Sequence, residues 1–223
     1  MPNLRFGSMV PNTLLSSAKS TKKIIHDFAE TAGMVYFGYV SQRDDEHHIL
    51  RGMTVSTKHH DDHYCIGTYD GYDVVFVERS DTLVSGKKHR WHILEFDLHT
   101  TADLPHAFIG SGKHGNGFHE LLNLKYPQLQ PIHLGATAEY PAEFTRKFNV
   151  YTTPAHAIGF ELLLHSDIAK IMASHFEGLV IELTEQALYV YSEKTHVSSD
   201  LLMTMLKNGA WLANQIDQNS RSS

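Results

Sequence analysis

The run from Lys58 to Cys65, KHHDDHYC, places the common protein ligands for metal ions within eight residues. Imidazole nitrogens and carboxylate oxygens bind Zn²⁺ and other divalent cations, either as structural sites or as sites that activate water for hydrolysis. One candidate chemistry for this stretch is therefore metal binding, or metal-dependent hydrolysis. The candidate ligands are His60, Asp61, Asp62 and His63.

The geometry of a β-strand divides these ligands between two faces. Asp70-Gly71, flanked by alternating segments, predicts a two-residue type I′ hairpin. On the preceding strand His60 and Asp62 would then share one face, and Asp61 and His63 the other. At most one of these pairs could begin a metal site, because a third ligand must come from elsewhere in the chain. The same register places Asp81 opposite His60, Arg79 opposite Asp62 and Glu78 opposite His63.

Those cross-strand neighbours support a second interpretation, in which the run is the charged, solvated end of a sheet strand. Opposite charges that face each other across two strands contribute about 0.2 to 1 kcal/mol. Single substitutions of His or Asp in the run would then have only small effects on folding. This interpretation favours a protein that does no metal chemistry, and the metal site is kept as the alternative.

Other chemistry finds less support in the sequence. The glycine-rich segment 110–117 matches neither the dinucleotide-binding nor the P-loop pattern. Cys65, the single cysteine, lies in a predicted strand, where a buried and unreactive thiol is expected. The chain contains no Gly-x-Ser-x-Gly nucleophile motif. No cofactor is therefore predicted, apart from the possible divalent metal such as Zn²⁺.

The elements that would position these residues predict an α+β fold. It consists of a mainly antiparallel sheet of hairpins with about three to four helices packed on it. Helices are expected from about Ser20, Ser166 and Ser199, and the last has apolar residues at the helical spacing of 3.6. Residues 118–124 could form a short helix. Predicted strands include residues 34–41, 49–57, 89–99, 105–109 and 158–164, and a hairpin covers residues 179–191.

The chain has 223 residues, which is within the range of one large domain. We expect a flexible N-terminal arm at residues 1–13, a single α+β domain at 14–217 and a flexible C-terminal tail at 218–223. No low-complexity segment separates two domains. No apolar run approaches the roughly 20 residues of a membrane-spanning helix, so a soluble protein without a membrane span is expected.

The composition limits the possible partners and the compartment. The formal net charge is −6 with 17 histidines, and basic residues do not cluster as nucleic-acid binding requires. A single cysteine excludes an intramolecular disulfide framework and suggests the reducing cytoplasm. Many histidines on an acidic chain also suggest a pH-responsive module.

Three blocks of the sequence resemble a family of bacterial proteins known as a domain of unknown function. They are Tyr64 to Gly71 (YCIGTYDG), Trp91 to Leu98 (WHILEFDL) and Phe144 to Tyr151 (FTRKFNVY), and the similarity continues to Tyr191. This resemblance implies one continuous α+β domain over roughly residues 60 to 192. It implies no established activity and no active-site residue, and members of the family often carry membrane segments ahead of this region.

Together these observations favour a non-enzymatic binding or interaction module. Its partner would be another protein or a second copy of the chain, and nucleic acid is not expected. The alternative is a metal-dependent hydrolase or a metal-binding protein that uses the His/Asp-rich run at residues 59–63.

Overall fold

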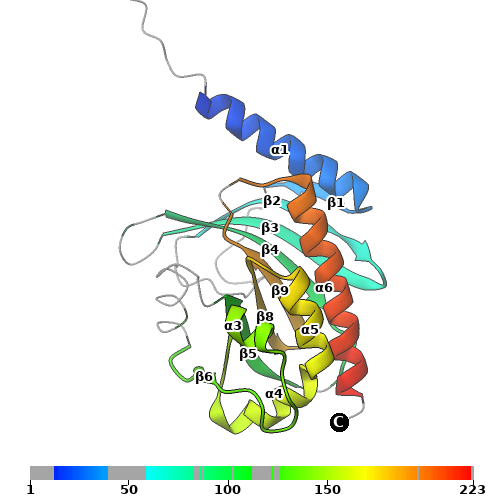
Figure 1. The fold of residues 1–223 in the computed structure, drawn as a ribbon. Helices are drawn as coiled ribbons and strands as arrows, with labels where there is room; N and C mark the ends of the chain where they lie inside the picture. Colours follow the sequence, from blue (N-terminus) through cyan, green and yellow to red (C-terminus); the bar gives the residue numbers. More distant parts are fainter. Residues whose placement is uncertain are drawn as a thin grey trace, which may run out of the picture.

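The computed structural model describes residues 13–39, 59–82, 86, 88–101, 103–111, 122, 126–194 and 196–221. Helices pack on one large antiparallel sheet (Figure 1), so the predicted α+β fold is confirmed. The nine strands are ordered β1-β2-β3-β4-β9-β8-β5-β7-β6. The strands are β1 (Val35–Gly38), β2 (His60–Tyr69), β3 (Tyr72–Thr82), β4 (Lys88–Asp97), β5 (Leu104–Ser111), β6 (Gln130–Ile132), β7 (Phe148–Thr152), β8 (Leu179–Glu185) and β9 (Ala187–Ser192). The helices within the described ranges are α1 (Thr13–Thr31), α3 (Ala142–Lys147), α4 (Ala157–Leu163), α5 (Ser166–His175) and α6 (Ser199–Ser220), with a short 3₁₀ turn at Pro154–His156.

The β2–β3 hairpin forms as its turn residues predict. Asp70 and Gly71 have φ angles of 51° and 88°, and a type I′ turn requires positive φ at both central positions. Near the turn, Tyr69 pairs with Tyr72 and Cys65 with Phe76, as predicted. The turn thereby determines which side chains of both strands point to each face of the sheet.

Alternation along the strands builds two apolar layers, one on each face of the sheet. On the face covered by the helices, Phe76 and Phe96 pack with Phe28 of α1 and Leu206 of α6. We call the opposite side the second face. It carries a smaller core that consists of Tyr64, Val77, Trp91, Ile93, Phe108, Leu122, Leu129, Tyr151, Val180, Tyr189 and Tyr191. The prediction that the strand around Trp91 is covered on both sides is confirmed.

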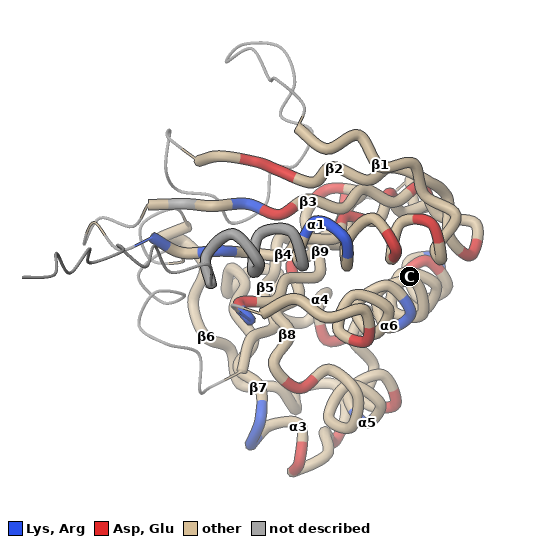
Figure 2. The backbone as a smooth tube through the Cα atoms, turned by 90° about the horizontal axis from the view of Figure 1, so that it is seen from above, with Lys and Arg blue, Asp and Glu red and all other residues tan. Residues whose placement is uncertain are grey.

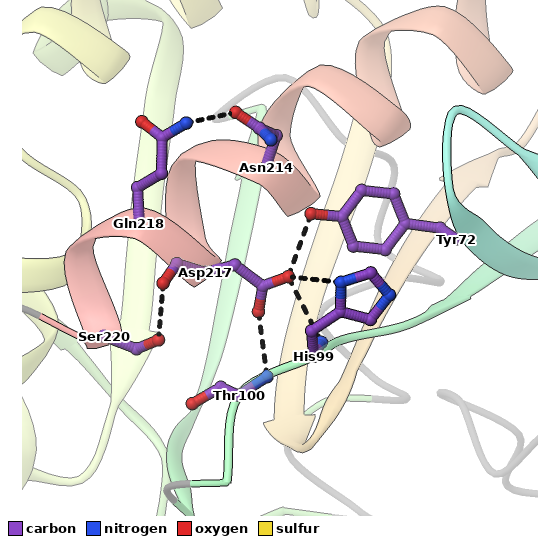
Figure 3. Close-up of polar contacts among 7 residues, drawn as sticks. All are labelled: Tyr72, His99, Thr100, Asn214, Asp217, Gln218 and Ser220. Carbon is purple, nitrogen blue, oxygen red and sulfur yellow. Dashed lines mark hydrogen bonds and ion pairs between the residues drawn. The ribbon is translucent and has the colours of Figure 1, made fainter.

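The last helix, α6, is capped at its start and attached to the sheet near its end. At its start the Ser198 hydroxyl accepts a hydrogen bond from the Leu201 amide at 3.2 Å. Near its end the buried carboxylate of Asp217 accepts hydrogen bonds from the Tyr72 hydroxyl at 2.9 Å and from the amides of His99 and Thr100 at 3.1 and 3.0 Å (Figure 3). These bonds join α6 to the start of β3 and to the segment after β4.

Both terminal helices extend beyond their expected bounds. Helix α1 begins at Thr13, ahead of the predicted start near Ser20. Helix α6 continues to Ser220, so the expected tail at 218–223 begins inside a helix. The Asn219 side chain donates a hydrogen bond to the Leu163 carbonyl at 2.9 Å, which holds this last turn against the body of the protein.

The predicted strand at residues 158–164 is wrong, because this segment forms α4. Phe160 and Leu163 are buried while Ile158 and Leu162 are 60% and 51% exposed, which is the spacing of a helix. Its Glu161 carboxylate is buried and accepts hydrogen bonds from the amides of residues 135–137. A short apolar run in the sequence does not distinguish a buried strand from a helix.

The predictions for residues 49–57 lie outside the described residues, and those for 110–117 and 118–124 lie mostly outside them. In the described part of the chain, no helix combines the length and the apolar character needed to cross a membrane.

Candidate binding surface

A β-bulge at His63 changes the register of the His/Asp-rich run. The pairing of β2 with β3 shifts between Asp62 and Cys65, and His63 has a φ of 59°. A bulge inserts one extra residue into one strand, so every pair beyond it moves by one position. Asp61 is therefore opposite Arg79, and Asp62 is opposite Glu78. The predicted pairing of Asp62 with Arg79 is wrong for this reason, as are the predicted partners of His60 and His63.

The bulge also separates the four candidate metal ligands. His60 Nε2 lies 3.1 Å from Asp62 Oδ2 at the exposed end of the strand. Asp61 turns to the second face, whereas His63 Nδ1 lies 2.7 Å from the Tyr36 hydroxyl of β1. The Asp61–His63 pair expected from simple alternation therefore does not form. Across the described ranges, the ligand atoms of this run are not part of any group of three that lie within 4.8 Å of one another.

Asp61 is held in a buried ion pair. Arg79 donates from Nε to Oδ1 at 2.7 Å and from Nη2 to Oδ2 at 2.6 Å, and the Tyr64 hydroxyl donates to Oδ2 at 3.1 Å. Arg79 is only 2% exposed and Asp61 only 7%. The interpretation of the run as a solvated strand end is thus wrong for Asp61, which belongs to the interior. With its carboxylate occupied by a bidentate guanidinium, this residue serves the fold.

A second buried group lies farther along the same face. Glu182 of β8 is fully buried, and its two carboxylate oxygens contact different partners. His106 Nε2 of β5 lies 2.9 Å from Oε1, and the Tyr191 hydroxyl donates to Oε2. Asp61 and Glu182 therefore both have matched partners, as buried charges generally do.

Toward the β2–β3 turn, the second face opens into two adjoining depressions of about 510 and 450 Å³. They share Glu95 and Asp97 of β4, and we call the combined feature the groove. Strands from both halves of the sequence form it, because β4 pairs with β9. Its lining includes Ile66, Thr68, Asp73 and Val75 on one side of β4 and Asp103, Thr184, Glu185 and Tyr189 on the other.

Glu95 is the most unusual residue of the groove. Its Oε1 accepts a hydrogen bond from the Tyr189 hydroxyl at 3.3 Å, while its buried Oε2 has no hydrogen-bond partner among the residues that the structure describes. Burial, and to a smaller extent the nearby Asp97 carboxylate, raise the pKa of Glu95 to about 7. The wall of the groove therefore contains an incompletely satisfied carboxyl group.

The groove is acidic throughout. Carboxylates reach it from β3, β4, β8 and the segment after β4, and its described lining contains no Lys, Arg or His. Figure 2 shows acidic positions at the turn end of the β2–β3 hairpin, and the basic positions of β3 and β4 toward the opposite end, where β2 and β3 also carry acidic positions. The carboxylates of the lining give the groove a negative potential that favours a cationic ligand.

Apolar side chains are exposed beside the groove, at the edge of the sheet. Val35 and Phe37 of β1 are 58% and 55% exposed, and Ile66 of β2 is 40% exposed. Val35 pairs directly with Ile66, so the two side chains lie on the same face of the sheet. We call these three residues the apolar edge. Because Ile66 also lines the groove, the acidic and apolar surfaces are continuous.

Sequence reasoning did not identify Glu95 or the apolar edge as functional. One signal was present, since Glu95 follows Trp91 and Ile93 on the same side of the alternating strand. A carboxylate in a row of residues that face a core is unusual and often marks a special environment. The contributions of Asp103 and Tyr189 could not be inferred, because they depend on the pairing of distant strands.

Comparison with known proteins identifies a similar fold but no family. No family model matches the chain, and no curated protein matches it. Among solved structures, the crystal structure of the mycobacterial trehalose monomycolate transport factor A, TtfA, is similar, with a TM-score of 0.59 and 9% sequence identity. The similarity covers 91% of this chain and 96% of that chain, so the two proteins share an overall fold.

Proposed function

We propose that this protein is a non-enzymatic interaction module that binds a partner protein through the groove and the apolar edge. The observation that carries this proposal is the junction of Glu95, whose Oε2 is buried without a described partner, with the exposed Ile66 and Val35. A surface that combines an apolar patch with unsatisfied polar groups is typical of a binding site.

The state of the other reactive groups supports a non-enzymatic role. Asp61 and Glu182 are occupied by Arg79 and by Tyr191 with His106. Burial raises the pKa of the Cys65 thiol to about 12, so this residue is not a nucleophile at neutral pH. Asp61, Glu182 and Cys65 therefore serve the fold.

The similarity to TtfA suggests a context for such a module. That protein is described as a transport factor for trehalose monomycolate. Because the shared fold extends over nearly the whole of both chains, we propose an accessory role in a transport assembly.

Photo-crosslinking in cells that express the full chain tests the proposal. A photoreactive phenylalanine analogue placed at Ile66 should give one discrete adduct, identified by mass spectrometry, and its yield should fall when Val35→Ser is added. The same analogue at Leu162 of α4, an exposed apolar position away from the groove, is the matched control. An adduct of twice the chain mass would identify a second copy as the partner. Equal adducts from both positions, or none, would refute the proposal.

Metal binding is the second candidate function, favoured by the 3.1 Å contact between His60 Nε2 and Asp62 Oδ2. A metal there would need further ligands from beyond this pair. Protein purified without an affinity tag should contain stoichiometric zinc or another divalent metal, and His60→Ala should remove it. Elemental analysis that finds no metal before and after dialysis against Zn²⁺ would eliminate this candidate.

A further inference from the structure

The chemistry of the groove specifies its occupant more closely. We propose that the groove receives a lysine or arginine side chain of a partner polypeptide, while apolar residues next to that cation pack on the apolar edge. This inference rests on the proposed function and adds the chemical class of the partner.

The first argument is the hydrogen-bonding state of Glu95. Its Oε1 is engaged by Tyr189, whereas its Oε2 is buried and lacks a partner in the described part of the chain. A buried acceptor without a donor costs free energy, and a donor from a partner would remove that cost. Ammonium and guanidinium groups supply N–H donors together with positive charge, and both properties match a carboxylate.

The second argument is charge complementarity. Asp97 on the strand of Glu95 and Asp73 on the neighbouring β3 are exposed, and Asp103 and Glu185 continue the negative surface. The described lining offers no Lys, Arg or His that could neutralise these carboxylates from within the groove. Such a surface attracts cations and discriminates against partners of the same sign.

The third argument decides between classes of partner. Phosphates make nucleic acids and the surfaces of anionic membranes negative, so the acidic groove would repel both. A cation alone would leave the apolar edge unused, although Val35, Phe37 and Ile66 are 58%, 55% and 40% exposed. A polypeptide segment that carries a basic residue beside apolar residues satisfies both surfaces.

Binding of designed peptides to the full chain tests this inference by fluorescence polarisation. The probe is a fluorescein-labelled peptide of alternating Lys and Leu, compared with a peptide of alternating Glu and Leu. We expect saturable one-to-one binding of the Lys/Leu peptide and none of the Glu/Leu peptide. The double variant Glu95→Gln, Asp97→Asn should bind the Lys/Leu peptide about tenfold more weakly or worse.

The matched control is the double variant Asp167→Asn, Glu177→Gln, which changes the net charge equally at exposed positions on and just after α5. It should keep the affinity of the unmodified chain within about twofold. Equal weakening in both double variants would show general electrostatic attraction and overturn the inference, as would binding of the Glu/Leu peptide. If the Lys/Leu peptide fails to bind while crosslinking at Ile66 succeeds, the specified cation is wrong and the proposed function stands. Failure of both experiments would reject both.

Discussion

Neighbouring residues of the His/Asp-rich run have different roles. Asp61 and Asp62 are consecutive carboxylates, yet Asp61 is buried against Arg79 and Asp62 pairs with His60 at the surface. The difference follows from strand alternation and from the bulge at His63, which places Arg79 opposite Asp61. Burial then determines how strongly each pair contributes, because removing one partner of a buried pair leaves an uncompensated charge.

Substitution of these two aspartates should therefore have unequal effects. Asp61→Asn leaves Arg79 buried without its counter-charge and should lower the free energy of unfolding by about 3 kcal/mol or more. Asp62→Asn removes a pair at the surface and should cost less than about 1 kcal/mol. Urea denaturation followed by circular dichroism measures both. Equal, small losses would show that the Asp61–Arg79 pair contributes little to stability.

Glu95 should make stability depend on pH. Its pKa is raised from 4.5 to about 7 in the folded protein, so folding favours the protonated form. The stability from this group is fully present below about pH 4.5 and is lost as the pH rises through about 7. The free energy of unfolding should therefore fall between pH 5 and 8, and it should fall less in Glu95→Gln. Burial also raises the pKa of Glu193 to about 7. Because Glu193 is present in both proteins, the contribution of Glu95 is the difference between the pH profiles of the unmodified chain and of Glu95→Gln, each measured by urea titration. Identical pH profiles would contradict the assignment.

At the scale of elements, close packing of α6 on the sheet depends on a glycine. A methyl group at Gly209 would lie 2.3 Å from Phe96 Cε2 and 3.1 Å from Val190 Cγ2, and Phe96 is fully buried in the core. The helix approaches β4 and β9 closely only because this position has no side chain. An interior glycine usually destabilises a helix. At this position the lower helix propensity is accompanied by closer packing of α6 on the sheet.

Substitution by alanine should separate these two effects. Gly209→Ala should lower the free energy of unfolding by about 1 to 3 kcal/mol, because the clash with Phe96 exceeds the gain in helix propensity. Gly159→Ala in α4, where no atom lies within 4 Å of the added methyl group, should instead raise stability by about 0.5 to 1 kcal/mol. Thermal denaturation of both variants tests whether Gly209→Ala lowers and Gly159→Ala raises the stability. Stabilisation by Gly209→Ala would show that α6 can move away from the sheet.

At the scale of the whole molecule, one sheet joins the two halves of the chain. Strand β4 pairs with β9, and β5 pairs with both β7 and β8, so segments far apart in sequence share hydrogen bonds. Helix α6 packs on β4 and β9 and is attached to the start of β3 through Asp217. We propose on this basis that the residues from about 14 to 217 form a single cooperative domain.

The two tryptophans allow this proposal to be tested. Trp91 lies in the core of the second face, and Trp211 packs against the core under the helices. Trp91→Phe and Trp211→Phe each leave one fluorescent reporter, one for each side of the sheet. In each variant, urea unfolding followed by tryptophan fluorescence and by circular dichroism should give the same midpoint. If the two probes separate in either variant, the sides unfold independently and the single-domain proposal fails.

The sequence by itself determined the features that depend on neighbouring residues. Asp70-Gly71 requires the backbone of a tight turn, alternation around Trp91 places apolar groups on both sides of a strand, and the apolar stripe that follows Ser199 predicts α6. Only the tertiary structure decided the positions that depend on distant partners. The bulge at His63, the burial of Asp61 and the groove around Glu95 arise from contacts between separate strands. Local residue types determine where the chain turns and how apolar residues are spaced along a helix or strand. The environment of a charged group is instead determined by the strand or helix that packs against it.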